Sequence, residues 1–296
     1  MNLFITGGSG FLGKNLIKEL VKDIEIEKIY CLEHKSPIDV KSQKLIRMKG
    51  NVSDIDKVRI DAPIDKMIVI TGVTNGRNAS IADTFKVNFE GTKKAITFCN
   101  NNLIKNIVFV SSINVMLSKK GAYAKSKVRA EKAVIDSGLN YTIFRPALIY
   151  GYNQPMGLGV IEKCIKNYGI VPIFGNGKKL EQPVHVKECS QIMAWYIMHS
   201  QNNRIIPITG RTPMAYNDLC LRIGKLMGKK TRLVHVPAKP FEMLLSFSER
   251  MEICLPISVE QIYHIDSDLD YDMSDVYKEV QFKTASFEDL YLLEEA

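Results

Sequence analysis

The sequence has no long apolar run. None of its hydrophobic stretches reaches the roughly 18 residues that a helix needs to cross a bilayer. Residues 1–6 lead directly into a glycine-rich loop and lack the charged region, apolar stretch and cleavage site of a signal peptide. We therefore expect a protein of the cytoplasm that has no membrane among its partners.

Closely paired cysteines are also missing. The sequence has 6 cysteines without a C-x-x-C pair, at Cys31, Cys99, Cys164, Cys189, Cys220 and Cys254. This wide spacing argues against a zinc site or a disulfide framework and fits a reducing compartment. We expect no metal, and we interpret each cysteine as a packed or surface thiol rather than a nucleophile.

Basic residues are numerous but do not form a run with interleaved aromatic residues. The net charge is +8, and the lysines are dispersed along the chain. This pattern disfavours nucleic acid as a partner and is compatible with a pocket for phosphates. The stretch 241–254 is amphipathic, and we interpret it as a helix of a small lobe rather than a membrane or partner surface.

Short apolar runs alternate with helical patterns in the first half of the chain. The expected strands cover residues 2–6, 29–32, 45–48, 67–70, 107–110 and 141–144, and the expected helices cover residues 11–22, 80–101 and 122–137. This alternation predicts an α/β fold, a Rossmann-type doubly wound parallel sheet covered on both faces. We assign residues 1–150 to a dinucleotide-binding domain, with strands returning at about 183–210. Residues 151–296 are assigned mainly to a smaller, mostly helical substrate lobe.

A glycine-rich loop lies between the first expected strand and the first expected helix. Gly7, Gly10 and Gly13 have the spacing G-x-x-G-x-x-G, which differs from the usual G-x-G-x-x-G. In this position, glycines let the backbone approach a pyrophosphate, which the N-terminus of the helix attracts. We expect Phe11 and Leu12, at the start of the helix, to contact the same cofactor.

Glu33 ends the second expected strand, twenty residues after Gly13. A carboxylate at this place accepts hydrogen bonds from the adenosine ribose and repels a 2′-phosphate, which favours NAD over NADP. His34 and Lys35 follow directly and leave NADP open as the alternative.

Proton-transfer chemistry is indicated by polar side chains that follow the carboxyl ends of later strands. Ser111 and Ser112 end the fifth strand, and Tyr123 and Lys127 lie four residues apart on one helix face. A lysine cation beside a phenol is expected to lower the phenol pKa, which suits a general acid or base coupled to hydride transfer.

These motifs resemble the extended short-chain dehydrogenase/reductase family, also called the NAD-dependent epimerase/dehydratase family. The resemblance covers most of the chain and selects Ser112 over Ser111, because Ser112 to Val115 follows the family's Ser/Thr-x-x-Val pattern. It implies Ser112, Tyr123 and Lys127 as catalytic residues and a homodimer formed through the Tyr123 helix. His185 belongs to a His-Val motif and is expected to be structural.

The resemblance also implies the ligand contacts. For the cofactor it adds Asn51, Val52, Thr71, Gly72, Val73, Asn88, Tyr123, Lys127, Phe144 and Pro146 to the glycine loop and Glu33. For the substrate it implies Thr74, Asn75, Ser112, Asn114 and Tyr123.

The chain departs from the family pattern at two places. Sugar 4,6-dehydratases of the family carry Asp-Glu directly after the catalytic hydroxyl, whereas Ile113 and Asn114 stand here, which disfavours dehydration. Glu181 stands where related epimerases often place an arginine that grips a diphosphate, and a carboxylate there would repel one.

Three functions follow from these patterns. The favoured one is an NAD-dependent nucleotide-sugar epimerase or 4-ketoreductase that uses Ser112, Tyr123 and Lys127. The alternatives are a reductase or dehydrogenase of a smaller alcohol or ketone, and a nucleotide-binding assembly protein without turnover.

Overall fold

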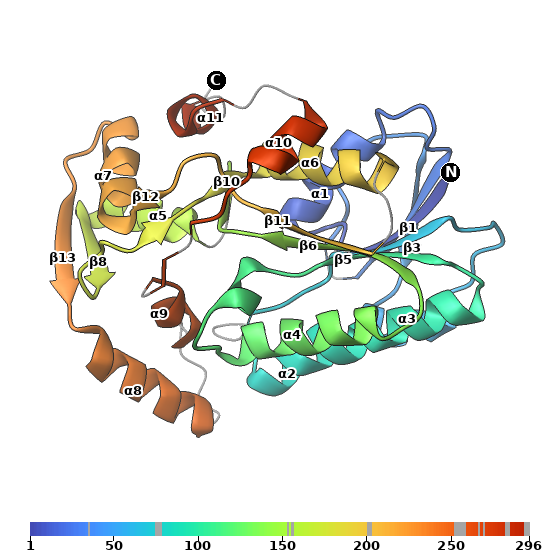
Figure 1. The fold of residues 1–296 in the computed structure, drawn as a ribbon, viewed down its shortest axis with the longest axis horizontal. Helices are drawn as coiled ribbons and strands as arrows, with labels where there is room; N and C mark the ends of the chain where they lie inside the picture. The colour runs from blue at the N-terminus through green and yellow to red at the C-terminus, as the bar shows by residue number, and fades with distance from the viewer. Residues whose placement is uncertain are drawn as a thin grey trace.

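The structure is a computed structural model, in which residues 1–146 together with residues 186–208 form a parallel sheet between two helical layers (Figure 1). It describes residues 1–34, 36–74, 79–152, 154, 157–199, 203–251, 259–265, 267–268, 270–281 and 285–292. The expected substrate contact Asn75 lies outside these ranges, and so does Lys35, which follows Glu33 and His34.

The central sheet has seven strands in the order β11-β6-β5-β4-β1-β2-β3, and all neighbouring pairs are parallel. The order reverses between β1 and β4, as in doubly wound sheets, and ligands bind beside such a switch point. The strands are β1 (Asn2–Thr6), β2 (Lys28–Glu33), β3 (Leu45–Lys49), β4 (Lys66–Val69), β5 (Asn106–Val110), β6 (Asn140–Pro146) and β11 (Arg204–Ile208). The predicted fold class is therefore confirmed.

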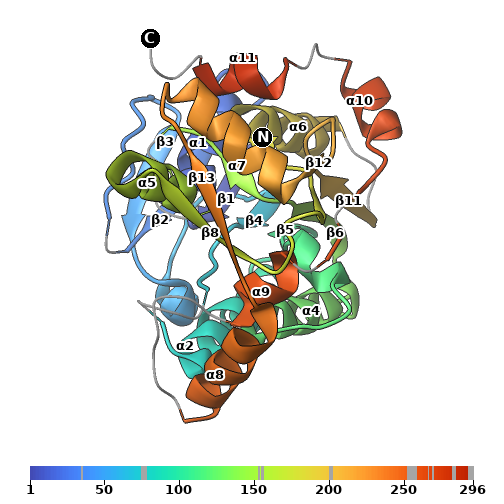
Figure 2. The same ribbon diagram turned by 90° about the vertical axis from the view of Figure 1, so that its left-hand side faces the viewer.

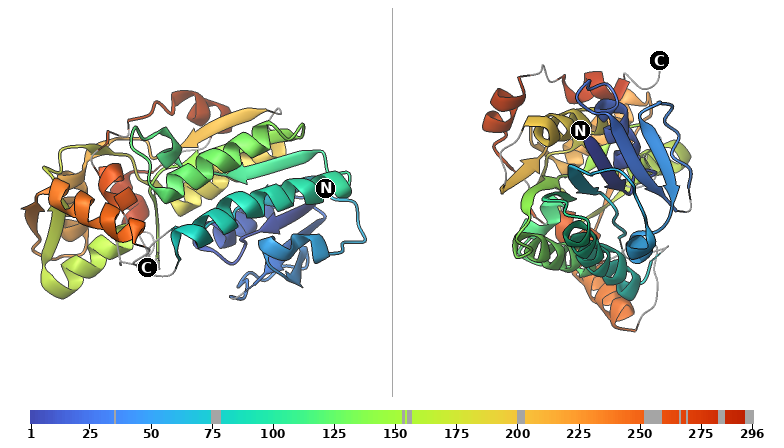
Figure 3. Two further views of the ribbon diagram at one scale, coloured as in Figure 1. Left: turned by 90° about the horizontal axis from the view of Figure 1, so that it is seen from below. Right: turned by 90° about the vertical axis from the view of Figure 1, so that its right-hand side faces the viewer.

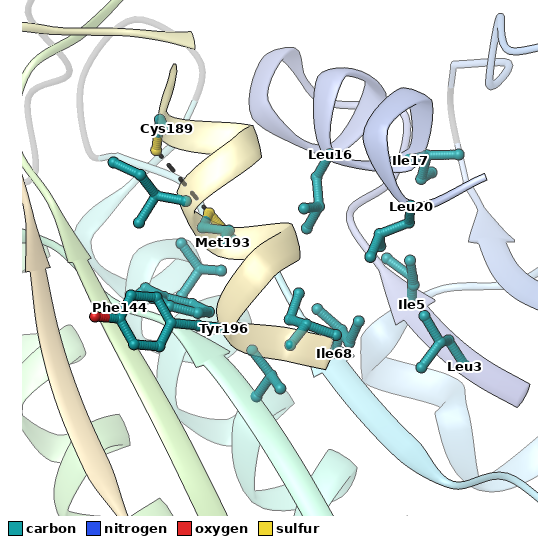
Figure 4. Packing of buried hydrophobic residues seen from close by; sticks show 14 of the residues in the cluster. Leu3, Ile5, Leu16, Ile17, Leu20, Ile68, Phe144, Cys189, Met193 and Tyr196 are labelled. Atoms are coloured by element: carbon teal, nitrogen blue, oxygen red, sulfur yellow. Dashed lines mark hydrogen bonds between the residues drawn. The ribbon is translucent and has the colours of Figure 1, made fainter. Parts of the chain in front are cut away.

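Each face of the sheet is covered by helices. Helices α1 (Phe11–Leu20) and α6 (Val186–His199) pack together on one face. Helices α3 (Gly91–Asn101) and α4 (Ala122–Ile135) lie side by side on the other face (Figure 3). Figure 4 shows the first layer from close by, where Leu16 and Leu20 face Leu3 and Ile5 of β1, and Tyr196 lies beside Phe144 of β6.

The expected helix 80–101 contains a change of pitch. It consists of α2 (Ile81–Phe85), a π-helical turn η2 (Lys86–Glu90) and then α3. The wider turn accommodates one extra residue in the backbone, and such turns are often found at functional sites. Here it carries Asn88, which is fully buried.

The second lobe is built from short paired strands and helices (Figure 2). The strand pairs are β7 (Ile149–Tyr150) with β10 (Val184–His185), β8 (Ile170–Phe174) with β13 (Arg232–Val236), and β9 (Leu180–Glu181) with β12 (Met214–Ala215). The helices are α5 (Leu158–Tyr168), α7 (Tyr216–Leu226), α8 (Ala238–Arg250), α9 (Val259–Ile265) and α11 (Phe287–Leu292). A separate apolar cluster around Ile173, Leu219 and Ile223 forms its core.

The chain returns to the first domain after residue 150. Helix α6 and strand β11 complete the sheet domain, and α10 (Ser274–Val280) packs against α6. Tyr277 joins the α1–α6 cluster, and its hydroxyl donates to the Thr209 carbonyl at 3.1 Å. The residues of the two parts therefore alternate along the chain. No helix within the described ranges is long and apolar enough to cross a membrane.

Candidate functional site

The glycine loop lies between β1 and α1, and its backbone is packed too closely for side chains. Gly7 has φ +81°, and a Cβ on it would lie 2.6 Å from the Thr71 nitrogen. A Cβ on Gly13 would overlap the carbonyl oxygen of Gly7. The Gly10 amide donates to the same oxygen at 3.1 Å. Glycine is therefore required for this turn by conformation at Gly7 and by space at Gly13.

The N-terminus of α1 is open to an anion. Gly10 is its N-cap, no described side chain caps it, and its first turn carries no acidic residue. Uncapped amides and the positive end of the helix dipole attract phosphate. The loop thus offers a closely packed glycine backbone and the uncapped amides that a dinucleotide pyrophosphate requires, so the residues present fit the predicted cofactor.

Glu33 and Asn51 follow the carboxyl ends of β2 and β3, beside this loop. The Glu33 carboxylate accepts a hydrogen bond from the Ile38 amide at 2.7 Å, which fixes the segment after β2. Asn51 caps the 3-10 helix η1 (Val52–Lys57), and its side-chain oxygen accepts from the Ser53 amide at 3.0 Å. Both side chains therefore have structural bonds, and their contacts to an adenosine stay predictions.

Asn88 ties the segment after β4 to helix α4. Its side-chain oxygen accepts from the Val73 amide at 2.8 Å, and its amide group donates to the Val73 carbonyl and the Ser126 hydroxyl, both at 2.9 Å. Ser126 in turn donates to the Tyr123 carbonyl at 2.7 Å. The hydrogen-bonding groups of this buried side chain are thus engaged with the protein, and Asn88 acts by holding residues 71–74 in place.

Lys127 is almost completely buried beside this segment. Its ammonium donates to the Val110 carbonyl at 2.9 Å and lies 4.9 Å from the centre of the Phe109 ring. A Cβ on Gly72 would lie 3.0 Å from it, so the lysine directly adjoins the expected cofactor segment. Burial lowers the pKa of Lys127 to about 8, against the opposing effect of the nearby Glu131 carboxylate.

Glu131 lies one turn beyond Lys127 and is itself buried. It forms a bidentate ion pair with Arg145, with N–O distances of 3.0 and 2.6 Å. The preceding residue, Phe144, packs in the sheet core against Tyr196. Of the expected contacts Phe144 and Pro146, the former has no exposed side-chain surface. Any contact of Phe144 with a cofactor would involve its backbone.

Ser112 and Tyr123 are brought together as expected. Ser112 begins the 3-10 helix η3 (Ile113–Met116) directly after β5, and its hydroxyl interacts with the Tyr123 phenol in a way that favours ionisation. The expected lowering of the phenol pKa is nevertheless wrong for this structure. Burial, together with the Glu260 charge, raises the pKa of Tyr123 to about 12. Lys127 is bonded to Val110 instead and does not offset these effects.

A polar network from the second lobe reaches the start of the Tyr123 helix. Asn114 donates to Glu260 at 3.2 Å and contacts His264 Nδ1 at 2.9 Å through its side-chain oxygen. The other oxygen of Glu260 accepts from the Ala124 amide at 3.3 Å. His264 Nε2 lies 3.0 Å from Glu181. Glu181 and Glu260 are both buried.

The Ala124 amide can only donate to one oxygen of Glu260, and the side-chain nitrogen of Asn114 faces the other oxygen. Glu260 therefore accepts, Asn114 donates to Glu260, and the Asn114 oxygen accepts from His264 Nδ1–H. The second ring nitrogen then shares a proton with Glu181. Burial opposes the charged form of His264, but interactions with Glu181 and, to a lesser extent, Glu260 outweigh it and raise the pKa of the ring above its usual value.

The network changes the interpretation of two residues. The Glu181 carboxylate is buried and paired with His264, so it would not present an unpaired negative charge to a diphosphate. Asn114 uses both ends of its amide on protein groups, so its expected substrate contact stays a prediction. Thr74 is exposed at the end of its segment. Sequence patterns missed Glu260 and His264 because they lie outside every family motif.

His185 is buried and structural contacts surround it. Its ring packs edge-on against Tyr150 at 5.1 Å, and Nδ1 accepts from the Lys187 amide at 3.3 Å. Among the described residues, no group of three or more histidine, cysteine and acidic side chains is placed to hold a metal.

The chain belongs to the NAD dependent epimerase/dehydratase family, whose model matches residues 3–208. This assignment confirms the resemblance that the motifs indicated. NAD, the predicted cofactor, is the one that the family description names. The matched part ends with β11, so it includes the whole central sheet.

Two curated relatives illustrate the range of this family. Divinyl chlorophyllide a 8-vinyl-reductase of Cucumis sativus is 26% identical over 260 residues, which are 80% of this chain and 59% of the relative. The 3 beta-hydroxysteroid dehydrogenase/Delta 5-->4-isomerase of Vaccinia virus (strain Copenhagen) is 26% identical over 217 residues, 63% of this chain and 56% of the relative. The chain thus matches less than two-thirds of the length of either relative.

Among solved structures, UDP-glucuronic acid 4-epimerase from Bacillus cereus, in complex with UDP-glucuronic acid and NAD, is similar in fold. The TM-score is 0.75 at 15% identity, with 99% of this chain and 98% of the epimerase covered. The shared fold therefore extends through both lobes.

Proposed function

We propose that the protein catalyses NAD-dependent oxidation or reduction at a carbon that carries a hydroxyl or carbonyl oxygen. The observation that carries this proposal is the meeting of Ser112 and Tyr123 at the end of β5, with the Lys127 ammonium buried beside Gly72. A polar hydroxyl, a phenol and a cation at the carboxyl edge of a parallel sheet suit proton transfer to or from a substrate oxygen.

The cofactor would be held by residues at the carboxyl edge of the sheet. The glycine loop and the N-terminus of α1 would hold the pyrophosphate, Glu33 the adenosine ribose, and Lys127 the second ribose. When bound, NAD supplies a hydride acceptor, and NADH a hydride donor.

The remaining chemistry belongs to side chains of the chain itself. Ser112 orients the substrate oxygen by hydrogen bonding, and Tyr123 Oη donates or accepts its proton. Because the pKa of Tyr123 is raised to about 12, the phenol is protonated at neutral pH in the protein alone. This state suits proton donation to a carbonyl oxygen during reduction.

For the substrate, the first candidate is a nucleotide sugar, and the activity an epimerase or 4-ketoreductase. The likeness to the Bacillus cereus epimerase, which includes the C-terminal lobe, supports it. Dehydration is disfavoured because Ile113 and Asn114 replace the acidic pair of the dehydratases, and Asn114 is already bonded to Glu260 and His264.

The second candidate is a reductase or dehydrogenase of a smaller alcohol or ketone. One observation favours it. Where related epimerases place a diphosphate-gripping arginine, this chain has a carboxylate that is buried and paired with His264. The steroid substrate named for the viral relative also carries no diphosphate. The expected homodimer through α4 and the cytoplasmic location remain predictions that accompany either candidate.

The experiment that tests the proposal begins with protein purified without added cofactor. The protein is denatured, and the released small molecules are identified by mass spectrometry. Stoichiometric NAD or NADH favours an epimerase, since an epimerase keeps its cofactor through turnover, and a co-released sugar nucleotide names the substrate class. Release of neither favours a reductase that exchanges its cofactor.

Titration with NADH and NADPH completes this experiment. Tight binding of NADH over NADPH is expected, because Glu33 disfavours a 2′-phosphate. Failure to bind either nucleotide would overturn the proposal. Nucleotide binding without turnover of any carbonyl or carbinol substrate would leave the third alternative, an assembly protein.

A further inference from the structure

Helix α8 exposes a continuous apolar face that no described part of the protein covers. Met243, Leu244, Phe247 and Met251, which directly follows the helix, have exposed fractions of 74%, 56%, 59% and 59%. Their spacing of three and four residues places them on one side of the helix. We call these four residues the outer face of α8.

The opposite side of α8 fastens it to the second lobe. Leu245 is buried in a cluster with Val259 and Ile262 of α9. Phe241 packs edge-on against Phe174 at 5.2 Å. These contacts fix the orientation of the helix. Its outer face points away from the lobe because the opposite side is packed. Figures 1 and 2 both show α8 at the lower edge of the molecule.

The charges of α8 are distributed unequally between its two sides. Its carboxylates are engaged inward: Glu242 pairs with Lys119 at 2.9 Å, and Glu249 accepts from the Val259 amide at 3.2 Å. Lys239, by contrast, is exposed one turn before Met243. The outer face thus has a cation at its margin and no carboxylate from α8, in a chain of net charge +8.

We propose that the outer face of α8 docks on an anionic lipid surface. An amphipathic helix with methionine, leucine and phenylalanine on one side and basic residues at the margin inserts in this way at the boundary between headgroups and acyl chains. A protein partner fits less well, because a stable protein interface takes roughly 20–30 residues a side, and this face offers four.

The proposal departs from the sequence expectation, which assigned this stretch to the lobe and no membrane to the partners. The structure has a helix over Ala238–Arg250, while residues 252–254 of the expected stretch lie outside the described residues. The membrane surface would use the side of this helix that the lobe leaves uncovered. The inner side of α8 packs on α9, which carries Glu260 and contacts α4, so the outer face points away from the elements that carry Glu260 and Tyr123. The docking proposal does not depend on the proposed oxidoreductase chemistry.

Co-sedimentation with lipid vesicles tests the proposal. The purified full chain is mixed with vesicles of phosphatidylcholine alone, or of phosphatidylcholine with phosphatidylglycerol. We expect binding to the anionic vesicles, and binding at least tenfold weaker after the double substitution Met243→Ser and Phe247→Ser. Lys239→Glu should weaken binding to anionic vesicles by about fivefold or more.

The matched control is the double substitution Ile24→Ser and Leu103→Ser. These side chains are even more exposed but belong to loops after α1 and α3, and their loss should leave vesicle binding unchanged. Thermal unfolding and NADH titration verify that every variant is folded, since all substituted side chains are on the surface.

Three results would overturn the proposal. The first is a wild-type chain that does not bind anionic vesicles. The second is vesicle binding by the α8 double variant that equals that of the wild type, and the third is a loss of binding in the control variant that equals the loss in the α8 double variant. Light scattering provides the remaining comparison. If Met243→Ser with Phe247→Ser splits a dimer and leaves vesicle binding intact, the occupant of this face is a second copy of the chain. None of these results would affect the oxidoreductase proposal.

Discussion

The cofactor side and the substrate side of the site are assembled in different ways. On the cofactor side, the glycine loop, the segment after β4 and Lys127 belong to one stretch of alternating strands and helices, and backbone packing dominates. On the substrate side, Asn114, Glu260 and His264 meet across 146 and 150 residues of sequence, and buried side-chain charges dominate. The cofactor side depends on the backbone conformation of the glycine loop and on the space around it. The substrate side depends on the pairing of buried polar side chains.

This difference teaches which mutations each side tolerates. A glycine turn fails when a methyl group is added, since the neighbouring backbone cannot move away. A buried charge network fails when one member is removed, because the remaining charge stays buried without a partner. Five substitutions, in decreasing order of expected effect, test the distinction.

The largest effect is expected for Tyr123→Phe, at the junction of the two sides. Removing the phenol oxygen leaves the ring packing intact but takes away the group that transfers the proton. We expect turnover of the substrate identified from the released ligands to fall at least about 100-fold. NADH affinity and the urea midpoint should stay close to wild type. Undiminished turnover would exclude Tyr123 as the acid or base.

On the substrate side, Glu181→Ala should be strongly destabilising. It leaves the His264 ring buried without the carboxylate that it faces, and breaking a buried pair costs about 3–5 kcal/mol in comparable cases. Urea unfolding measures this loss. Glu181→Gln is the control, since it keeps the volume and one acceptor oxygen, and it should lose less. Equal stability of Glu181→Ala and wild type would mean that the pair contributes nothing.

The same pair predicts a pH dependence. Because the folded pKa of His264 is raised above its usual value, its ionisation stabilises the fold fully below pH about 6.5, and this contribution is lost as pH rises through the folded pKa. The difference in unfolding free energy between wild type and His264→Gln should shrink with rising pH. A constant difference would argue against a charged ring.

On the cofactor side, Lys127→Met should reveal the cost of burying the ammonium. The folded pKa is lowered to about 8 from 10.5, so the unfolded chain binds more protons between these values. Wild-type stability relative to Lys127→Met should therefore rise with pH over this window, by roughly 3 kcal/mol in total. Urea unfolding across that range measures it. A flat difference would show that Lys127 is hydrated.

The smallest effect is expected for Gly13→Ala, which adds one methyl group against the carbonyl of Gly7. We expect a loss of about 1–3 kcal/mol in stability, with weaker NADH binding because the loop must shift. Gly10→Ala is the matched control, since its Cβ would lie 3.3 Å from the same oxygen and meet it less severely. Similar NADH affinities for the two variants would contradict a conformational role of Gly13.

The same contrast explains how much the sequence predicts. The seven parallel strands, the glycine turn and the Ser112–Tyr123 contact follow from periodicity and short motifs, which record local interactions. The role of Glu181 does not, because its partner His264 lies 83 residues away in a helix without a motif. The expected pKa of Tyr123 was wrong for a related reason: the burial that mainly raises it, and the smaller effect of the Glu260 charge, both arise only in the tertiary fold.

The helix around Asn88 falls between these cases. Its motif predicts a role at the cofactor, but the π-helical turn and the three hydrogen bonds that tie it to Val73 and Ser126 depend on backbone geometry. A hydrophobic pattern over residues 80–101 does not distinguish a regular helix from one with a wider turn, since both bury one face.

The return of α10 to the sheet domain affects how the chain is made. Translation releases β1, α1 and β6 long before Tyr277 and Val280 emerge, yet these late residues belong to the same apolar cluster as Leu16 and Phe144. A nascent chain therefore carries an incompletely covered sheet until α6, β11 and α10 have been synthesised, and during that time its apolar face is available to chaperones or to other nascent chains.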